Sequence, residues 1–254
     1  MLKKWLCLCL LPLILSCAAA RKETPVLGAE DQFALAKREY EKKKYSSAVL
    51  EFQKLIFNYP GAASLDSAQF LLGMCYFNEK DYSSSVGEFK KVLSSFSESP
   101  LANDASFMIA YAHYKDSPKP ELDQTNTLKA IQELKDFLDE YPDSKHAPEA
   151  QKILFEARSK LAQKLYKNGR LYFKLKQYDA ALLYLQDVLD QYSDTRYAAP
   201  ASFLKGESYR EQRKYDLAEL EYRKFLEKYP EDKLANKVKM RLKNLDKDKI
   251  QAKK

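Results

Sequence analysis

Few side chains in this 254-residue chain could carry out catalysis or hold a metal ion. Its two histidines, His113 and His146, have no partners at metal-ligand spacing, and four cysteines leave little material for a zinc cage. The carboxylates of Asp139, Glu140 and Asp143 cluster near an expected helix end, which is typical of a solvated face. No phosphate-loop, zinc-protease or esterase motif occurs. We therefore expect a protein that is not an enzyme and that uses no metal or cofactor.

The composition narrows the remaining classes of function. With 45% apolar and 31% charged residues, the chain can bury a sizeable core, and only 6 glycines argue against turn-dense β structure. The formal net charge of +7 is spread over mixed lysines and glutamates and forms no basic block. We expect an all-α protein with no nucleic-acid partner.

One cysteine near the start suggests a covalent modification. Two lysines precede an apolar run over residues 5–15, and Ser16 and Cys17 follow it. The run is shorter than the ~20 residues that a membrane-spanning helix needs. It ends in Leu-Ile-Leu-Ser-Cys, which resembles the bacterial lipobox, whose cysteine is acylated and becomes the first mature residue. We predict a lipoprotein signal peptide over 1–16 and lipidation (palmitate and other acyl chains) at Cys17.

Acyl chains on one cysteine would anchor the protein to a membrane without crossing it, since each buried CH₂ contributes about 0.8 kcal/mol. Ala18 follows the cysteine where an aspartate could stand, and by resemblance to bacterial lipoproteins this implies the outer membrane, facing the periplasm. A flexible tether over 17–30 and a repeat domain over 31–254 would follow. The alternative is an ordinary cleaved signal that ends near 18–20.

The rest of the chain repeats one phrase five times. The phrase places apolar or small residues at offsets of 0, 3, 7, 10 and 14 from an opening residue. These spacings put the side chains on one face of an α-helix, and proline or polar residues stop it. The first copy reads Tyr45, Ala48, Phe52, Leu55, Tyr59 and Pro60, and later copies open at Tyr82, Thr127, Tyr178 and Tyr215.

Each repeat also predicts a preceding helix. A small residue lies nine positions before the opening residue, as at Gly73, Gly169 and Gly206. A glycine disfavours a helix, so we expect it to let the alanine of the second helix approach closely. Repeated helix pairs of this length are the tetratricopeptide pattern. Five of them would form a right-handed superhelical solenoid, which a last helix around Leu242 and Leu245 would cap.

The repeats are not evenly spaced. Their opening residues are separated by 37, 45, 51 and 37 positions, so the third copy has 8 extra residues and the fourth has 14. Pro118 and Pro120 predict a loop between the two helices of the third unit. The apolar pattern between Pro142 and Gly169 runs without a breaker, which predicts a lengthened first helix in the fourth unit.

Aromatic residues recur on the first helices, which line the concave surface of such solenoids. They could form a ladder that holds an extended, partly apolar peptide. The alternative is that the rings pack between neighbouring units, since an aromatic stripe at helical spacing is usually core. The second series is the better candidate for ligand contact. The first series is Phe33, Phe70, Phe107, Tyr166 and Phe203, and the second is Tyr40, Phe77, Tyr114, Phe173 and Arg210.

The organisation as a whole resembles the BamD family, the tetratricopeptide lipoproteins of the outer-membrane β-barrel assembly (BAM) complex. Beyond the lipobox and five repeats, the resemblance rests on Asp123-Gln124-Thr125, on Thr127 to Ile131, and on Phe137 with Tyr141-Pro142. It implies a scaffold that docks on the barrel protein BamA, among other assembly lipoproteins, and helps to recognise unfolded outer-membrane proteins. The C-terminal repeats would face BamA, and the N-terminal repeats would be available to substrate.

Two other functions compete with this expectation. A periplasmic tetratricopeptide adaptor could coordinate cell-wall synthesis or envelope constriction, although the segment 18–30 has no heptads for the N-terminal coiled coil common in such proteins. A wall-cleaving hydrolase built on a helical solenoid lacks any candidate nucleophile or acid–base pair.

Overall fold

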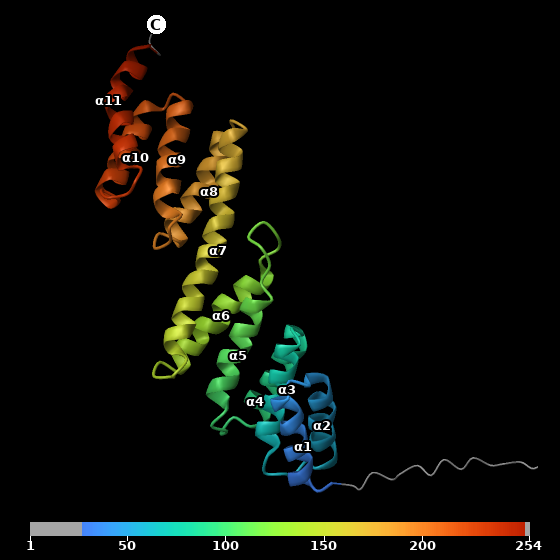
Figure 1. The fold of residues 1–254 in the computed structure, drawn as a ribbon. Coiled ribbons are helices and arrows are strands. Elements are labelled where there is room, and N and C mark those ends of the chain that lie inside the picture. Colours follow the sequence, from blue (N-terminus) through green and yellow to red (C-terminus); the bar gives the residue numbers. More distant parts are fainter. Residues whose placement is uncertain (1–26, 252–254) are drawn as a thin grey trace, which may run out of the picture.

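A computed structural model describes residues 27–251, with side chains as far as Leu245. The predicted signal peptide, Cys17 and most of the predicted tether lie outside these residues. Within the described part, the regular structure is eleven helices (Figure 1). They are α1 (Ala29–Glu41), α2 (Tyr45–Asn58), α3 (Leu65–Asn78), α4 (Tyr82–Ser95), α5 (Ala102–Lys115), α6 (Thr125–Glu140), α7 (Ala147–Lys174), α8 (Tyr178–Gln191), α9 (Ala198–Glu211), α10 (Tyr215–Lys228) and α11 (Ala235–Gln251).

The helices form five consecutive pairs and one closing helix. Each helix packs on the next along the chain, so the molecule is an elongated array with α1 and α2 at one end and α11 at the other (Figure 1). This confirms the predicted solenoid of helix pairs with a last helix after them. The first helix begins at Ala29, two residues before the start predicted for the repeat domain.

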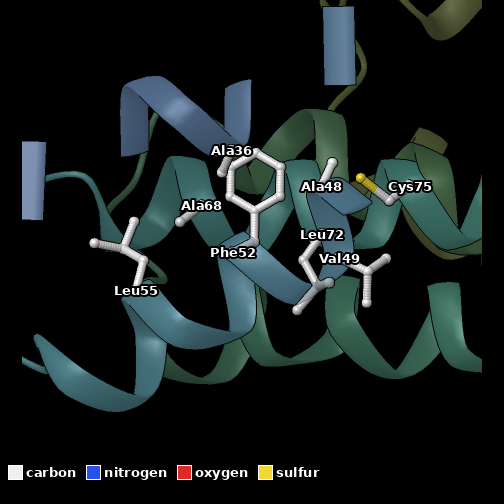
Figure 2. Packing of buried hydrophobic residues seen from close by; sticks show 8 residues of the cluster. All are labelled: Ala36, Ala48, Val49, Phe52, Leu55, Ala68, Leu72 and Cys75. Atoms are coloured by element: carbon white, nitrogen blue, oxygen red, sulfur yellow. The ribbon is translucent and has the colours of Figure 1, made fainter. Parts of the chain in front are cut away.

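The second helix of each pair supplies the repeated core. Residues at offsets 3, 7 and 10 are buried in α2, α4, α6, α8 and α10, as the spacing predicts. In the first unit, Phe52 and Leu55 are fully buried. Figure 2 shows the Phe52 ring reaching from α2 toward Ala36 of α1, with Leu72 of the following helix close by. Each pair therefore buries one face within itself and a second against its neighbour.

In three of the first helices the glycine makes room mainly for a large side chain of the second helix; the alanine we expected also approaches at Gly169, where the Ala181 carbonyl lies 3.4 Å from a built Cβ. A Cβ built on Gly73 would lie 2.7 Å from the Phe89 ring, and one on Gly206 would lie 2.6 Å from the Tyr222 ring. At Gly169 the obstructing group is Leu185, at 2.9 Å. All three obstructing residues stand at offset 7. The glycine thus sets the distance between the two helices of a pair.

The turn inside four of the five pairs contains a strained residue. Lys43, Lys80, Lys176 and Arg213 have φ of 59°, 65°, 60° and 60°, the left-handed region that non-glycine residues rarely adopt. The backbone explains why: the N–H that follows Lys43 donates to the Glu39 carbonyl at 2.9 Å, and the other three turns repeat this bond. The short turn brings the end of each first helix against the start of the second.

The two irregular spacings appear where the sequence predicts them. Residues 116–124 form a loop between α5 and α6, and α7 has 28 residues where the other first helices have 13 or 14. The first half of α7 packs with α5 and α6 through Ala150 and Ile153. Its second half packs with α8 and α9 through Leu165 and Tyr166. One helix is therefore shared by two hydrophobic cores.

The closing helix is fixed by a buried charged group. Glu207 of α9 is 6% exposed and accepts hydrogen bonds from the Tyr222 hydroxyl and, at 2.9 and 3.1 Å, from Arg241 Nε of α11. Burial and the neighbouring carboxylate raise the pKa of Tyr222, so its hydroxyl remains a donor. Because a charge buried without its partner is costly, this group fixes α11 in one position on α9 and α10.

Because Gly73 lies so close to the Phe89 ring, we expect alanine at this position to destabilise the protein, the opposite of its usual effect in a helix. Gly73→Ala should lower the free energy of unfolding by about 1–2 kcal/mol, because overpacking against Phe89 outweighs the gain of about 1 kcal/mol in helix propensity. Urea unfolding followed by circular dichroism measures it.

Gly87 is the matched control. It lies in the middle of α4, is exposed, and has nothing within 4 Å of a built Cβ. Gly87→Ala should therefore stabilise the protein by up to about 1 kcal/mol. Equal effects of the two substitutions would contradict the proposed role of Gly73.

Candidate peptide-binding site

Most of the first aromatic series is packed inside the repeat units. Phe33, Phe70 and Phe203 lie 6.1, 5.3 and 6.4 Å, between ring centroids, from the offset-7 rings of their own units. Phe107 is 3% exposed and lies 5.6 Å from Phe137. Tyr166 differs, because its ring faces Tyr197 of the next unit at 5.9 Å. Four of these rings pack within their own units, which is the packing alternative. Tyr166 packs on the next unit, and both Tyr166 and Phe203 also line a cavity.

The second aromatic series lies at the turns. Tyr40, Phe77 and Phe173 each contact the opening tyrosine of the following helix edge-on, with ring centroids 5.7, 5.4 and 5.6 Å apart. Phe77 also stacks on Tyr111 at 5.4 Å, so its removal would open a gap on both sides. Arg210 forms ion pairs with glutamates 207 and 211.

Tyr114 is placed differently from the rest of its series. The 116–124 loop replaces the short turn in its unit, so no opening tyrosine lies beside it. Its hydroxyl donates to Glu156 Oε2 of α7 at 2.7 Å. Burial, together with this carboxylate, raises the pKa of Tyr114 to about 12, so the hydroxyl stays protonated near neutral pH.

Two cavities lie along the first helices of units three to five. The first has a volume of about 470 Å³ and lies between α5, the 116–124 loop, α7 and the start of α9. The second has a volume of about 320 Å³ and lies between α7, α9 and the start of α11. The first is lined by Tyr114, Pro120, Phe155, Glu156, Ser159, Lys160, Gln163, Arg196 and Tyr197; the second by Tyr166, Arg170, Phe173, Lys174, Pro200, Phe203, Leu204 and Leu234.

Both cavities open on the same face of α7. The nine residues of α7 that line them run from Phe155 to Lys174 and fall within an arc of about 140° at 100° per residue. At about 1.5 Å per residue, this face is about 29 Å long. We refer to the two cavities with this face of α7 as the α7 groove. It brings together four predicted residues: Tyr114, Tyr166, Phe173 and Phe203.

The 116–124 loop is fastened to α7 and forms one wall of the groove. Lys160 Nζ donates to Ser117 Oγ at 2.5 Å, and Lys164 Nζ donates to the Leu122 carbonyl at 2.6 Å. Lys167 forms an ion pair with Glu121 of the loop. Burial lowers the pKa of Lys160, whose ammonium also lies 5.3 Å from the centre of the Tyr114 ring. The loop insertion and the longer helix thus depend on each other.

Aromatic, aliphatic, polar and basic side chains line the groove, and Glu156 is the one acidic residue among the described residues that line it. In residues 27–245, no group of three or more histidines, cysteines or acidic residues is positioned to hold a metal. His146 bonds to Asp104 at 2.8 Å and stacks on Phe107. Cys75 is buried, and burial raises its pKa to about 12, so it is not a reactive thiolate.

Sequence reasoning singled out as site residues only four of the 17 residues that line the two cavities of the groove. Phe155, Arg170, Lys174, Arg196 and Tyr197 all line it, yet none stands at a repeat position that we singled out. The extra residues of the fourth unit carried a signal that could have identified Arg170 and Lys174. There the chain continues as an unbroken helix with a basic residue every three or four positions, which is the spacing of one helical face.

A linear array of helix pairs with a groove along its first helices defines this chain as a tetratricopeptide-type helical-repeat protein. The comparison with family models agrees: residues 28–220 match the model described as outer membrane lipoprotein (YfiO). Because the match covers most of the chain, the protein belongs to this family of outer membrane lipoproteins.

Individual relatives are more distant. Outer membrane protein assembly factor BamD of Rickettsia prowazekii (strain Madrid E) is 26% identical over 169 residues, which are 66% of this chain and 67% of that protein. Among solved structures, the TPR2AB-domain complex with pHSP90 of yeast Sti1 covers 80% of this chain and 78% of its own at 13% identity and a TM-score of 0.43. The tetratricopeptide protein TTC0263 of Thermus thermophilus covers 86% and 98% at 18% identity and a TM-score of 0.36. Because both TM-scores are below 0.5, neither structure supports an argument about the site.

Because Lys160 holds the 116–124 loop on α7, we expect its replacement to loosen this loop and to leave the helices unchanged. Lys160→Met keeps the apolar stem but removes the ammonium that holds Ser117, so amide hydrogen exchange should accelerate over residues 117–122. Protection of α5 and α7 should persist. Lys152→Met, an exposed position on the same helix, is the control. Unchanged exchange in the loop of the Lys160 variant would show that the other contacts suffice.

Proposed function

We propose that this protein is a lipid-anchored, non-catalytic scaffold of outer-membrane β-barrel assembly that binds extended segments of unfolded outer-membrane proteins in the α7 groove. The α7 groove is the observation that carries this proposal, because it joins two cavities with aromatic walls on one continuous face. Membership of the outer membrane lipoprotein family and the relation to an assembly factor named BamD support the cellular role.

The dimensions of the groove suit a barrel strand. A groove of about 29 Å accommodates about nine residues of extended chain at 3.3 Å per residue. Transmembrane β-strands have about 9–11 residues, with apolar side chains at alternate positions. Resemblance alone suggested the N-terminal repeats for substrate. We place the substrate in units three to five, because both cavities of the α7 groove lie there.

Docking on a BamA-like barrel protein would use a different surface. Leu183 of α8, Leu220 of α10 and Met240 of α11 are 71%, 47% and 61% exposed. Large apolar side chains exposed on neighbouring helices are typical of protein–protein contacts. They belong to the C-terminal units, which the family resemblance assigns to this partner, and none of them lines the α7 groove.

The membrane attachment would rest on Cys17 alone. None of the helices between residues 27 and 251 has the length and apolarity to span a membrane. The chain enters the first unit beside Tyr59, whose hydroxyl donates to the Leu27 carbonyl. This contact would fix the point at which the tether leaves the repeat domain.

Replacing the acylated residue should release the protein from the membrane. The Cys17→Ala variant should move from the outer-membrane fraction to the soluble periplasmic fraction, because the acyl chains supply the anchoring free energy. Mass spectrometry of the N-terminal peptide should show acyl chains on the wild type only. A Cys75→Ala variant is the control and should stay in the membrane. An unacylated wild-type chain that begins near Ala20 would establish the ordinary cleaved signal in place of lipidation.

Binding in the groove can be tested by crosslinking in cells. A photoreactive phenylalanine analogue at Gln163, which lines the first cavity, should crosslink to unfolded outer-membrane proteins. The same analogue at Phe57 is the control, because Phe57 is 84% exposed on α2 and outside the groove. In purified protein, Tyr166→Ala should weaken binding of a nine-residue barrel-strand peptide at least tenfold. Phe57→Ala should leave it unchanged.

The proteins recovered with the intact lipoprotein decide between the scaffold and the adaptor. A BamA-like barrel protein as the dominant crosslinked partner supports the scaffold, and Leu183→Arg with Leu220→Arg should reduce its recovery. Recovery of cell-wall enzymes without a barrel protein would contradict it and establish the adaptor of wall synthesis or constriction.

A further inference from the structure

A row of basic residues follows the long helix beside the groove. Its members are three or four positions apart and lie on one side of α7, within about 120° of arc. Three of them hold the 116–124 loop through a hydroxyl, a carbonyl and a carboxylate. The row consists of Lys160, Lys164, Lys167, Arg170 and Lys174.

The last two members of the row lie beyond the loop. Arg170 and Lys174 line the second cavity, are exposed, and have no ion pair with any described carboxylate. Among the described side chains, no acidic residue lines this cavity. Lys237 adds a further positive charge, because its ammonium lies 4.8 Å from the centre of the Phe203 ring in the cavity wall. The second cavity is therefore an apolar hollow with a cationic rim.

The loop supplies one example of a carboxylate on this row. Within the loop segment 117–122, Ser-Pro-Lys-Pro-Glu-Leu, Glu121 pairs with Lys167. A carboxylate of a ligand placed along the groove would meet the same chemistry at Arg170 and Lys174. Oppositely charged groups also guide a ligand into a cleft before the apolar contacts form.

We propose that the α7 groove selects extended segments in which an aromatic or large aliphatic side chain stands two positions from an aspartate or glutamate, so that both lie on the same face of the segment. The apolar side chain enters the second cavity, and the carboxylate pairs with Arg170 and Lys174. The midpoints of the α7 residues that line the two cavities, positions 159 and 170, are eleven residues apart, or about 16.5 Å. Side chains four residues apart on one face of an extended chain span about 13 Å, so a second apolar side chain at that spacing reaches the first cavity.

The inference rests on the proposed peptide-binding function and adds the chemical class of the ligand. The test uses the mature chain and fluorescent eleven-residue peptides with amidated C-termini, so that only side chains supply negative charge. One peptide carries Phe at two positions four residues apart, with a Glu two residues after each Phe. A second replaces each Glu with Gln, and a third replaces each Glu with Lys.

Fluorescence anisotropy should show the Glu peptide binding at least tenfold more tightly than the Gln peptide at 50 mM salt, with the difference shrinking at 300 mM. The variant Arg170→Glu with Lys174→Glu should lose this preference and favour the Lys peptide. A matched variant with the same net charge, Lys135→Glu with Lys152→Glu, changes two exposed lysines outside the groove and should keep the preference. Tyr166→Ala should weaken both the Glu and the Gln peptides.

Different failures identify different errors. If the Glu and Gln peptides bind equally and Tyr166→Ala weakens both, the peptide groove stands and the acidic preference is overturned. If the matched control loses the preference as fully as the groove variant, the attraction belongs to the net charge and the inference fails. If no peptide binds and Gln163 yields no crosslink, the proposed function fails as well.

Discussion

The distance between the two helices of a pair is set by one contact, and the rest of the molecule depends on it. A small residue on the first helix faces a large side chain at offset 7 on the second: glycine opposite Phe89, Leu185 and Tyr222, and alanine in the cores with Phe52 and Leu134. With the small residue in place, the large side chain is fully buried and neighbouring pairs can stack in one direction. That stacking leaves the first helices on a shared side, where a ligand can reach several units at once.

The groove arises where the repeat is broken. Units with regular turns fill the space at the end of the first helix with paired rings, as Phe77 and Tyr82 do. The third unit has a loop there, and the fourth has a helix twice the usual length, so Tyr114 bonds to Glu156 and borders a cavity. Functional positions are expected where local regularity fails.

The sequence predicted the architecture well because the information is local and repeated. Spacings of 3, 4, 3 and 4 identified the buried face of every second helix, and Pro118 and Pro120 located the loop. The turns escaped prediction, because Lys43 and its equivalents adopt a left-handed conformation that residue type disfavours and only the closure of the helix pair explains. The site was predicted only in part, with four of its 17 lining residues. Tyr166 and Phe173 stand at repeat positions, whereas Arg170 and Lys174 gain meaning only beside α9 and α11.

Sharing α7 between two cores also shapes how the molecule comes apart. In a simple repeat array, each interface between neighbours contributes separately, and unfolding can begin at either end and stop at any boundary. Here Ala150 and Ile153 belong to one core, and Leu165 and Tyr166 belong to the next, all on a single continuous helix. In α3, α5 and α9 the two cores are served by the two sides of one stretch, whereas in α7 they are served by its two halves. We therefore expect units three and four, which carry the groove, to unfold as one block, since separating them requires α7 to break in its middle.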